Sequence, residues 1–239
     1  MASATRPLGS LRAFERWLLP GECLLCLQPT GGAPDDPLVC AVCRSRWRPV
    51  PDPVCGRCGQ PEIPGLACRL CADWGETLSR VRSAVWLDAG PRRAVHHLKY
   101  DGWWRVAEAM ADAMRRLEPL AHAQVLVPVP LARRRERERG YNQSQRLAAA
   151  LARWSGGRVL AGALARTRET RSQTALTPEA RRANVEGAFG ARGVRGLAIV
   201  LVDDVFTTGA TLLAAARALR DAGAARVDAV TFARARGPL

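Results

Sequence analysis

An α/β fold, with a parallel sheet flanked by helices behind a small cysteine-rich part, is predicted for this chain by three observations. Apolar strand-like runs alternate with helix-like segments after residue 76, and this alternation favours a parallel sheet. The run Leu197–Val202 is apolar throughout, which is typical of a strand buried on both faces. All eight cysteines lie before residue 72. A chain of 239 residues can hold one large core and a smaller module, so we expect two parts, residues 1–75 and residues 76–239.

The first 20 residues predict a short helix and no targeting segment. Leu8–Leu19 has a partial apolar face, and Pro20 would end the helix. Arg12, Glu15 and Arg16 interrupt the apolar residues, which argues against a signal peptide. No run of about 18 apolar residues occurs in the sequence, so no membrane span is expected. We therefore expect a cytoplasmic protein whose cysteines have a role in a reducing compartment.

The cysteines form four C-x-x-C pairs, separated by 13, 11 and 9 residues. Each C-x-x-C turn places two sulfur atoms on one side of a tight knuckle, and two knuckles can surround a zinc ion with Zn–S distances of about 2.3 Å. The segment is rich in proline and poor in hydrophobic periodicity, so bound metal would supply its folding energy. We expect two structural Zn²⁺ sites of four cysteines each. The predicted ligands are Cys23, Cys26, Cys40, Cys43, Cys55, Cys58, Cys68 and Cys71.

The spacing alone leaves the pairing of these knuckles open. Sequential pairing joins the first pair to the second and the third to the fourth, whereas interleaved pairing joins alternate pairs. Disulfides, an iron–sulfur cluster and thioredoxin-like redox pairs are the competing interpretations of the cysteines. Zinc is favoured over them because no β-α-β context surrounds any pair and because two sites use all eight ligands.

One strand and two helices are expected between the cysteines and residue 120. Residues 81–87 form a strand-like apolar run. Pro91 can occupy the first turn of a helix over residues 91–100. A second helix over residues 104–117 would end before Pro119.

From residue 124 onward the alternation of strands and helices is regular. Gly156-Gly157 follows the first expected helix, and Gly223, a natural C-terminal cap, follows the second. Residues 165–184 between them are polar, basic and irregular in pattern. The expected strands are 124–129, 158–164, 185–189, 197–202 and 226–233, and the expected helices are 142–154 and 211–221.

The formal net charge is +14, and nearly all of the positive charge is arginine because Lys99 is the only lysine. Residues 131–182 hold thirteen Arg and four Glu, a net charge of +9. Arginine makes forked contacts to phosphate, so this stretch indicates an anionic partner. The alternative is that these arginines are solvated helix faces in an arginine-rich proteome.

The segment Ile199–Thr211 carries the most specific chemistry in the sequence. Its apolar strand leads into Asp203 and Asp204, at the carboxyl end where open α/β sheets place their ligands. The next residues form a hydroxyl-rich loop whose Gly209 lets the backbone approach a ligand closely. Free N–H groups at the start of the following helix would bind an anion. A phosphorylated sugar fits, because its phosphate would occupy the loop and its hydroxyl groups would donate to the carboxylates. The loop is not a P-loop, because it lacks the G-x-x-x-x-G-K-[ST] pattern.

These thirteen residues resemble the phosphoribosyl-pyrophosphate (PRPP) signature of type I phosphoribosyltransferases. More of the chain, about residues 20–235, resembles the ComF family of competence-associated, phosphoribosyltransferase-like proteins with an N-terminal double zinc ribbon. The blocks that carry this resemblance, besides the cysteine pairs, are His97-Leu98-Lys99-Tyr100, Val127-Pro128-Val129-Pro130, Arg139-Gly140-Tyr141-Asn142-Gln143, Ser172-Gln173-Thr174-Ala175-Leu176, Arg181-Arg182-Ala183-Asn184-Val185 and Gly187-Ala188-Phe189.

The resemblance implies a role for each part of the loop. Asp203 and Asp204 would be the catalytic pair that binds the 2- and 3-hydroxyls of ribose. The 5-phosphate would lie against the loop residues Val205, Thr207, Thr208, Gly209, Ala210 and Thr211. Mg²⁺ would accompany PRPP and hold its pyrophosphate.

The resemblance also implies two segments near the pyrophosphate. The loop from Pro128 to Arg134 would face it, and residues 167–184 would form a mobile flap over the site. The cations expected to neutralise it are Lys99, Arg133, Arg134, Arg171, Arg181 and Arg182. The alternatives are that the flap arginines belong to a solvated loop and that Lys99 caps a helix.

Two functions remain open on the sequence. The first is a phosphoribosyltransferase that transfers phosphoribosyl from PRPP to an unknown acceptor with release of pyrophosphate, in association with DNA uptake. The second is a non-catalytic module that binds single-stranded DNA or a helicase-like partner in natural transformation. Trp103, Trp104 and Trp154, which lie among arginines, could stack on bases, or they could be packing residues. The final strand–helix elements usual in such a core are either truncated or replaced by residues 81–119.

Overall fold

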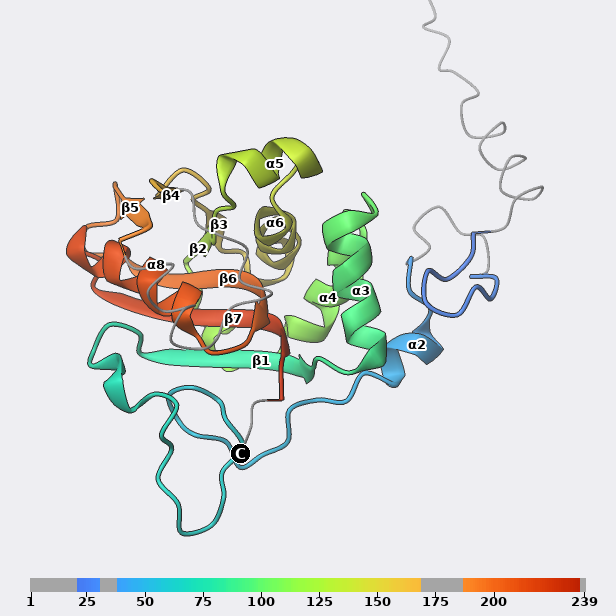
Figure 1. Ribbon diagram of the computed structural model, residues 1–239, viewed down its shortest axis with the longest axis horizontal. Coiled ribbons are helices and arrows are strands. Elements are labelled where there is room, and N and C mark those ends of the chain that lie inside the picture. The colour runs from blue at the N-terminus through green and yellow to red at the C-terminus, as the bar shows by residue number, and fades with distance from the viewer. Residues whose placement is uncertain (1–20, 31–37, 169–186, 237–239) are drawn as a thin grey trace, which may run out of the picture.

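The computed structural model describes residues 21–30, 38–168 and 187–236 (Figure 1). The helix expected at 8–19 and most of the expected flap, including Arg171, Arg181 and Arg182, lie outside the described residues. In the described part, no helix is long and apolar enough to cross a membrane.

A five-stranded parallel sheet forms the centre of the molecule, as the alternation of elements predicts (Figure 1). Its strand order is β1-β7-β6-β2-β3, and every neighbouring pair is parallel. The strands are β1 (Arg80–Trp86), β2 (Val125–Pro128), β3 (Arg158–Val159), β6 (Ala198–Phe206) and β7 (Arg226–Arg234). Because β1 pairs with β7, residues upstream of the other strands supply the edge strand beside β7.

Helices cover both faces of the sheet. One face carries α3 (Ala89–Tyr100), α4 (Val106–Met114) and α6 (Gln143–Ser155). The other face carries α8 (Ala210–Asp221) together with a small antiparallel pair, β4 (Leu164–Arg166) and β5 (Phe189–Ala191). Val200 and Val202 of β6 pack with the first face, whereas Ile199 and Leu201 pack with the second. This two-sided burial explains why the strand is apolar at consecutive positions.

Besides the end of β6, three sequence-based boundaries are wrong. The strand expected over 158–164 is two strands, because β4 leaves the main sheet to pair with β5. The strand expected at 185–189 is β5, which begins at Phe189. The expected loop from Pro128 to Arg134 runs into an unpredicted helix, α5 (Arg133–Arg139), which Gly140 ends at a φ of 79°. Shorter helical turns that the sequence did not predict are α2 (Ala41–Ser45), η1 (Ala72–Trp74) and η2 (Glu118–Leu120).

The strand that carries the two aspartates is longer than expected. Pairing between β2 and β6 stops at Pro128 and Val202, the residue where the sequence predicted the strand to end. Pairing between β6 and β7 continues to Phe206 and Arg234. Asp203 and Asp204 therefore lie within the last residues of β6, where pairing with β7 but not with β2 holds the backbone.

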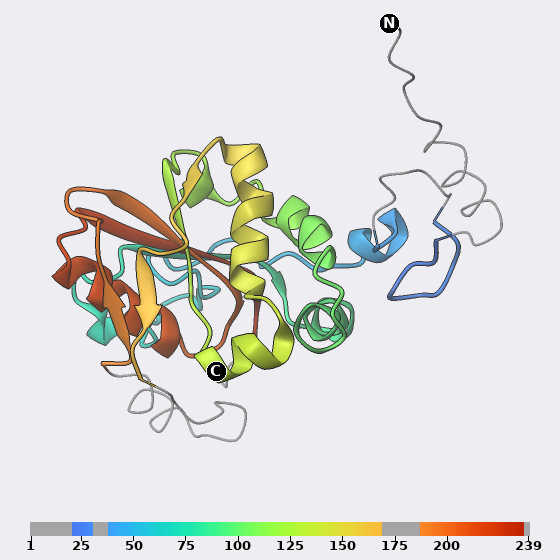
Figure 2. The same cartoon turned by 90° about the horizontal axis from the view of Figure 1, so that it is seen from above.

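The two cysteine segments lie in different places. The first, with α2, lies at one end of the molecule beyond α3 and α4, and the second lies beneath the β1 edge of the sheet (Figures 1 and 2). Trp47, which follows α2, packs edge-on against Phe232 of β7 with ring centroids 5.0 Å apart. Cys58 and Cys71 of the second segment are buried in the cluster that includes α8. The division of the chain at residue 75 stays a prediction.

Candidate functional site

The candidate site lies at the point where the chain direction across the sheet reverses. From β2 the chain passes through α6 to β3 on one side, and from β6 it passes through α8 to β7 on the other side. Open α/β sheets bind ligands at the carboxyl ends of the two strands that flank such a point. The carboxyl end of β6 is where the aspartates and the hydroxyl-rich loop lie.

The turn between β6 and α8 has the backbone of an anion-binding loop. Gly209 is the N-cap residue of α8 and has a φ of +78°, which favours glycine. The amide of Ala210 donates to Oγ1 of Thr208 at 3.4 Å, and Thr207 is exposed. The first amides of α8 lack partners within the helix, and the helix dipole favours negative charge there. The turn can therefore hold a phosphate group.

The two carboxylates are held by different elements. Oδ1 of Asp203 accepts from Oγ of Ser144 in α6 at 2.8 Å and from the amide of Asp204 at 3.0 Å. Asp204 is only 3% exposed, and its Oδ2 forms an ion pair with Nζ of Lys99 in the last turn of α3. The only lysine in the chain thus neutralises one of the two predicted ribose-binding carboxylates.

Burial and neighbouring charges shift the pKa values of Asp203 and Lys99. Burial and the neighbouring Asp204 carboxylate raise the pKa of Asp203 from 3.8 to about 7, against the opposing effects of Lys99 and the Ser144 hydrogen bond. Burial acts to lower the pKa of Lys99, but Asp204 and Asp203 together raise it above its ordinary value. At neutral pH the site therefore holds a charged lysine and an easily protonated Asp203.

The segment Arg139–Gln143 positions the residues around the carboxylates. The hydroxyl group of Tyr141 donates to the carbonyl of Leu98, next to Lys99. The side chain of Asn142 donates to the carbonyl of Val129 at 3.1 Å, just beyond β2, and accepts from the amide of Ser144 at 3.0 Å. As the N-cap of α6, Asn142 fixes the first turn of the helix from which Ser144 reaches Asp203. No role was predicted for Ser144 from the sequence, although it lies one residue beyond a segment that carries the family resemblance.

The cysteines form two separate groups with sequential pairing. Cys23, Cys26, Cys40 and Cys43 make the first cluster, and Cys55, Cys58, Cys68 and Cys71 make the second, with the four sulfur atoms of each cluster within 4.8 Å of one another. None of the eight forms a disulfide.

The geometry of both clusters fits tetrahedral zinc. The separation of Sγ atoms is 3.8 Å for Cys26 and Cys40, and 3.7 Å for Cys55 and Cys71. A tetrahedron with Zn–S distances of about 2.3 Å has edges of about 3.8 Å. In the first cluster, Sγ of Cys23 also accepts from the amides of Leu25 and Cys40, each at 3.4 Å.

Two family models match the chain. One described as "Phosphoribosyl transferase domain" matches residues 131–238, and one described as "Double zinc ribbon domain" matches residues 14–72. "DNA utilization protein YhgH" of Salmonella typhimurium is 34% identical over 88% of this chain and 95% of its own length. "Competence protein ComFC" of Bacillus subtilis is 31% identical over 83% of this chain and 85% of its own length. The chain belongs to the ComF family. "Competence protein F" of Haemophilus influenzae is 34% identical over 53% of this chain and 57% of its own length.

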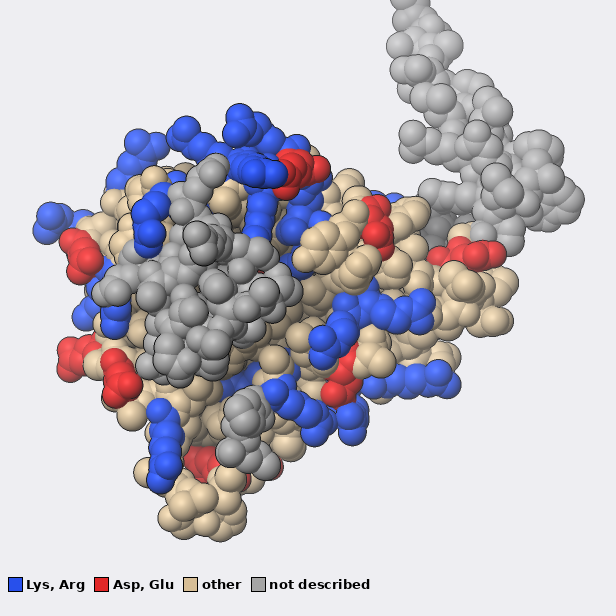
Figure 3. Space-filling model, in the orientation of Figure 1, with Lys and Arg blue, Asp and Glu red and all other residues tan. Residues whose placement is uncertain are grey.

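The described cations that the sequence proposed for this ComF-family site lie in two different environments. Lys99 is at the carboxylates, as described above. Arg133 and Arg134 lie on the exposed α5, where basic side chains gather, and Arg134 forms an ion pair with Glu138 at 2.8 Å (Figure 3). The roles predicted for Asp203, Asp204, the loop and these cations stay predictions.

Two other arginines act on the carboxylates, and the sequence analysis did not select them. Burial lowers the pKa of Arg139, and the charge of Asp204 opposes that effect. Burial and the nearby Arg135 lower the pKa of Arg166 in β4, and the charge of Asp203 opposes them. Arg139 belongs to a segment that carries the ComF resemblance, which could have indicated it. Arg166 lies in β4, whereas the sequence pattern places residue 166 in the irregular basic stretch 165–184.

Metal analysis of the purified full chain should find two zinc ions per protein. The Cys26→Ser and Cys68→Ser variants each remove one ligand from one cluster, so each should retain about one zinc, because three thiolates bind more weakly than four. The measurement is elemental analysis of dialysed protein. Loss of both ions from either single variant would show that the clusters do not bind independently.

The stability of the chain should depend on pH through Asp203. The pKa of Asp203 is raised in the folded state. The stability that the protonated Asp203 contributes to the fold is therefore fully present below pH 3.8 and is lost as the pH rises through about 7. From about pH 5 to about pH 8, the free energy of unfolding of the native chain should fall by roughly 2–3 kcal/mol relative to Asp203→Asn. Urea unfolding of both proteins at each pH measures this difference, and parallel pH dependences would contradict it.

Proposed function

We propose that this ComF-family protein binds PRPP together with Mg²⁺ at the β6–α8 turn. The observation that carries the proposal is the placement of Asp203 and Asp204 at the end of β6, just before the short turn to Gly209 and α8, at the reversal point of the sheet. The amides at the start of α8 and the hydroxyls of the turn suit a 5-phosphate. The paired carboxylates suit the ribose hydroxyls, which would donate to them.

The surrounding cations suit the pyrophosphate end of the same ligand. Arg139 and Arg166 place positive charge near the carboxylates from two different elements. Lys99 pairs with Asp204, which orients that carboxylate in the free protein. When bound, Mg²⁺ would supply further charge neutralisation to the pyrophosphate.

We further propose that this arrangement supports transfer of phosphoribosyl to an acceptor with release of pyrophosphate. The developing positive charge on the ribose ring would lie beside the two carboxylates, and the developing negative charge on pyrophosphate would lie beside the arginines. The names of the relatives, "Competence protein ComFC" and "DNA utilization protein YhgH", support a setting in DNA uptake or use.

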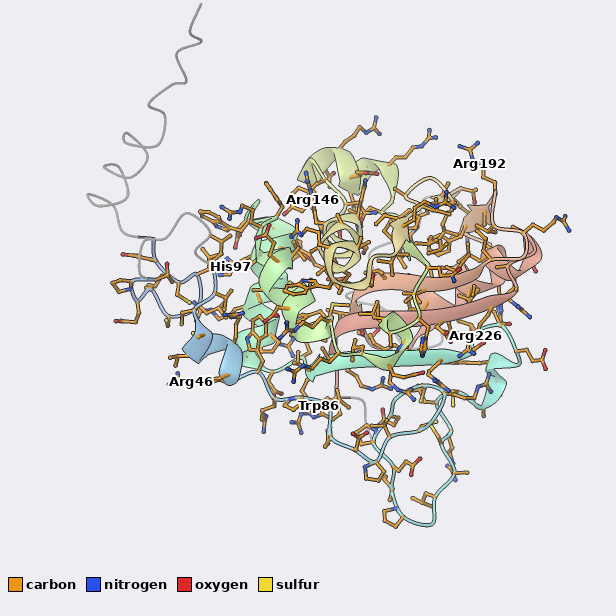
Figure 4. The ribbon with its side chains drawn as sticks, turned by 180° about the vertical axis from the view of Figure 1, so that it is seen from behind. Arg46, Trp86, His97, Arg146, Arg192 and Arg226 are labelled. Carbon is orange, nitrogen blue, oxygen red and sulfur yellow. The ribbon has the colours of Figure 1, made fainter. Side chains whose placement is uncertain are left out.

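Calorimetric titration with PRPP and Mg²⁺ tests the binding proposal. The zinc-loaded protein should bind, and the Asp203→Asn/Asp204→Asn variant should bind at least about tenfold more weakly, or about 1.4 kcal/mol, because amides hold the diol less well. Arg192→Ala is the control, because this exposed arginine lies away from α3 and α6 (Figure 4). No heat with the native protein, or equal affinity in the double variant, would refute the proposal. Pyrophosphate release upon addition of an acceptor separates turnover from binding alone.

A second candidate function is binding of single-stranded DNA, and one surface favours it. Tyr100, Trp103 and Trp104, at the end of α3 and in the turn after it, are 66%, 46% and 41% exposed. Arg139 lies over Tyr100 at 5.5 Å, and Arg146 lies over Trp104 at 4.6 Å. We call these five residues the aromatic–arginine surface. Exposed rings beside arginines bind single strands by stacking and by charge, with little sequence preference.

Fluorescence anisotropy with a labelled oligothymidine tests this second function. The Trp104→Ala and Arg146→Ala variants should each weaken binding by roughly tenfold, because each removes a stacking or phosphate contact. Affinity should also fall steeply with salt. Arg192→Ala removes the same charge as Arg146→Ala at a position well separated from Arg146 and away from α3 (Figure 4). Equal losses in the two arginine variants would show that only net charge matters and would refute a defined surface.

A further inference from the structure

Trp74 connects the second cysteine cluster to the phosphate loop. It lies in η1, three residues after the cluster residue Cys71, and is only 3% exposed. Its ring packs against the ring of Phe206 with centroids 6.3 Å apart and planes tilted by 57°. Its Cζ2 atom would lie 2.9 Å from a Cβ atom on Gly209. Trp74 thus contacts the loop from beneath, at the glycine whose backbone begins α8.

Arg234 makes a second connection from the same cluster to the same ring. This arginine is 1% exposed, and it donates to the carbonyl of Cys58 at 2.8 Å and to the side chain of Gln60. Its guanidinium group lies 4.1 Å from the centroid of the Phe206 ring. Two groups tied to the second cluster therefore contact Phe206, which is the last residue of β6 and the first residue before the loop.

The first cluster is tied to a different part of the molecule. Arg93 of α3 donates to the carbonyl of Leu25 at 2.7 Å, and Cys23 and Cys43 are buried with α4 and α6. Cys58 and Cys71 are instead buried with Phe206 and with Leu212 of α8. The two clusters therefore differ in what they support, and the first is a natural control for the second.

We propose that the second cysteine cluster positions the phosphate loop, with Trp74 and Arg234 as the positioning residues. Metal bound to that cluster fixes the backbone around Cys58 and Cys71, and the two side chains transmit this rigidity to Phe206 and Gly209. A loop that binds phosphate through backbone amides gains affinity when those amides are already ordered. The affinity of the loop for a phosphorylated ribose then depends on the second metal and much less on the first. The part of this inference that concerns affinity rests on the proposed function, whereas the ordering of the loop does not.

Hydrogen exchange of the full chain without ligand tests the ordering. In Trp74→Ala, amides 206–211 should exchange about tenfold or more faster than in the native protein. Trp74→Phe keeps an aromatic contact and should remain close to the native rate. Trp47→Ala removes a buried tryptophan beside the first cluster and should leave amides 206–211 unchanged. Unchanged exchange of the loop in Trp74→Ala, or equally faster exchange throughout the sheet, would overturn the proposal.

The metal ligands provide the second arm of the test. Cys68→Ser and Cys26→Ser alter partly exposed cysteines of the second and first clusters. Loop exchange should rise in Cys68→Ser only, and a rise in both variants or in neither would overturn the proposal. Titration with PRPP and Mg²⁺ should then show at least about tenfold weaker binding in Trp74→Ala and Cys68→Ser than in Trp47→Ala and Cys26→Ser. If the loop loosens as expected but the native protein binds no PRPP, the proposed function fails while the positioning role stands.

Discussion

Two adjacent carboxylates at the end of a buried strand are the constraint around which this structure is arranged. Burying a charge is costly unless it is paired and hydrogen-bonded. The chain meets that cost from two helices on the same face of the sheet, with Lys99 of α3 beside Asp204 and Ser144 of α6 donating to Asp203. The raised pKa of Asp203 shows that burial and repulsion still outweigh this compensation. A ligand whose hydroxyl groups donate hydrogen bonds to both carboxylates would stabilise their charged forms.

The connections that hold those partners in place form a short chain of contacts. Tyr141 fixes the end of α3 through the carbonyl of Leu98, and Asn142 fixes both the end of β2 and the start of α6. Gly140 allows the sharp turn between α5 and this segment. Gly140, Tyr141 and Asn142 thus align both helices with the carboxylates. The segment that the sequence marks only as a family resemblance therefore has a structural role at the site.

Local patterns predicted the strands, the cysteine ligands and the β6–α8 turn, because each depends on neighbouring residues. The specific pairing of Lys99 with Asp204 and of Ser144 with Asp203 could not be predicted, because only the packing of α3 and α6 on the sheet brings these side chains to the carboxylates. The same limit explains why Arg139 was not selected together with Arg133 and Arg134. All three lie on α5, and the charge interaction of Arg139 with Asp204 depends on how α5 packs, which its local sequence does not reveal. The predicted end of β6 was placed too early because its pairing with β7 continues to Phe206, whereas its pairing with β2 stops at Val202.

The two proposed functions meet at the end of α3. Lys99 faces Asp204, and the next residue, Tyr100, is exposed beneath Arg139, whose charge also acts on Asp204. A DNA strand stacked on the aromatic–arginine surface would therefore bring its phosphates close to Arg139, which the first proposal assigns to the PRPP site. Negative charge placed near Arg139 would compete with pyrophosphate for the same cation. Binding of PRPP and binding of single-stranded DNA should accordingly weaken each other, and by thermodynamic reciprocity the factor must be equal in both directions.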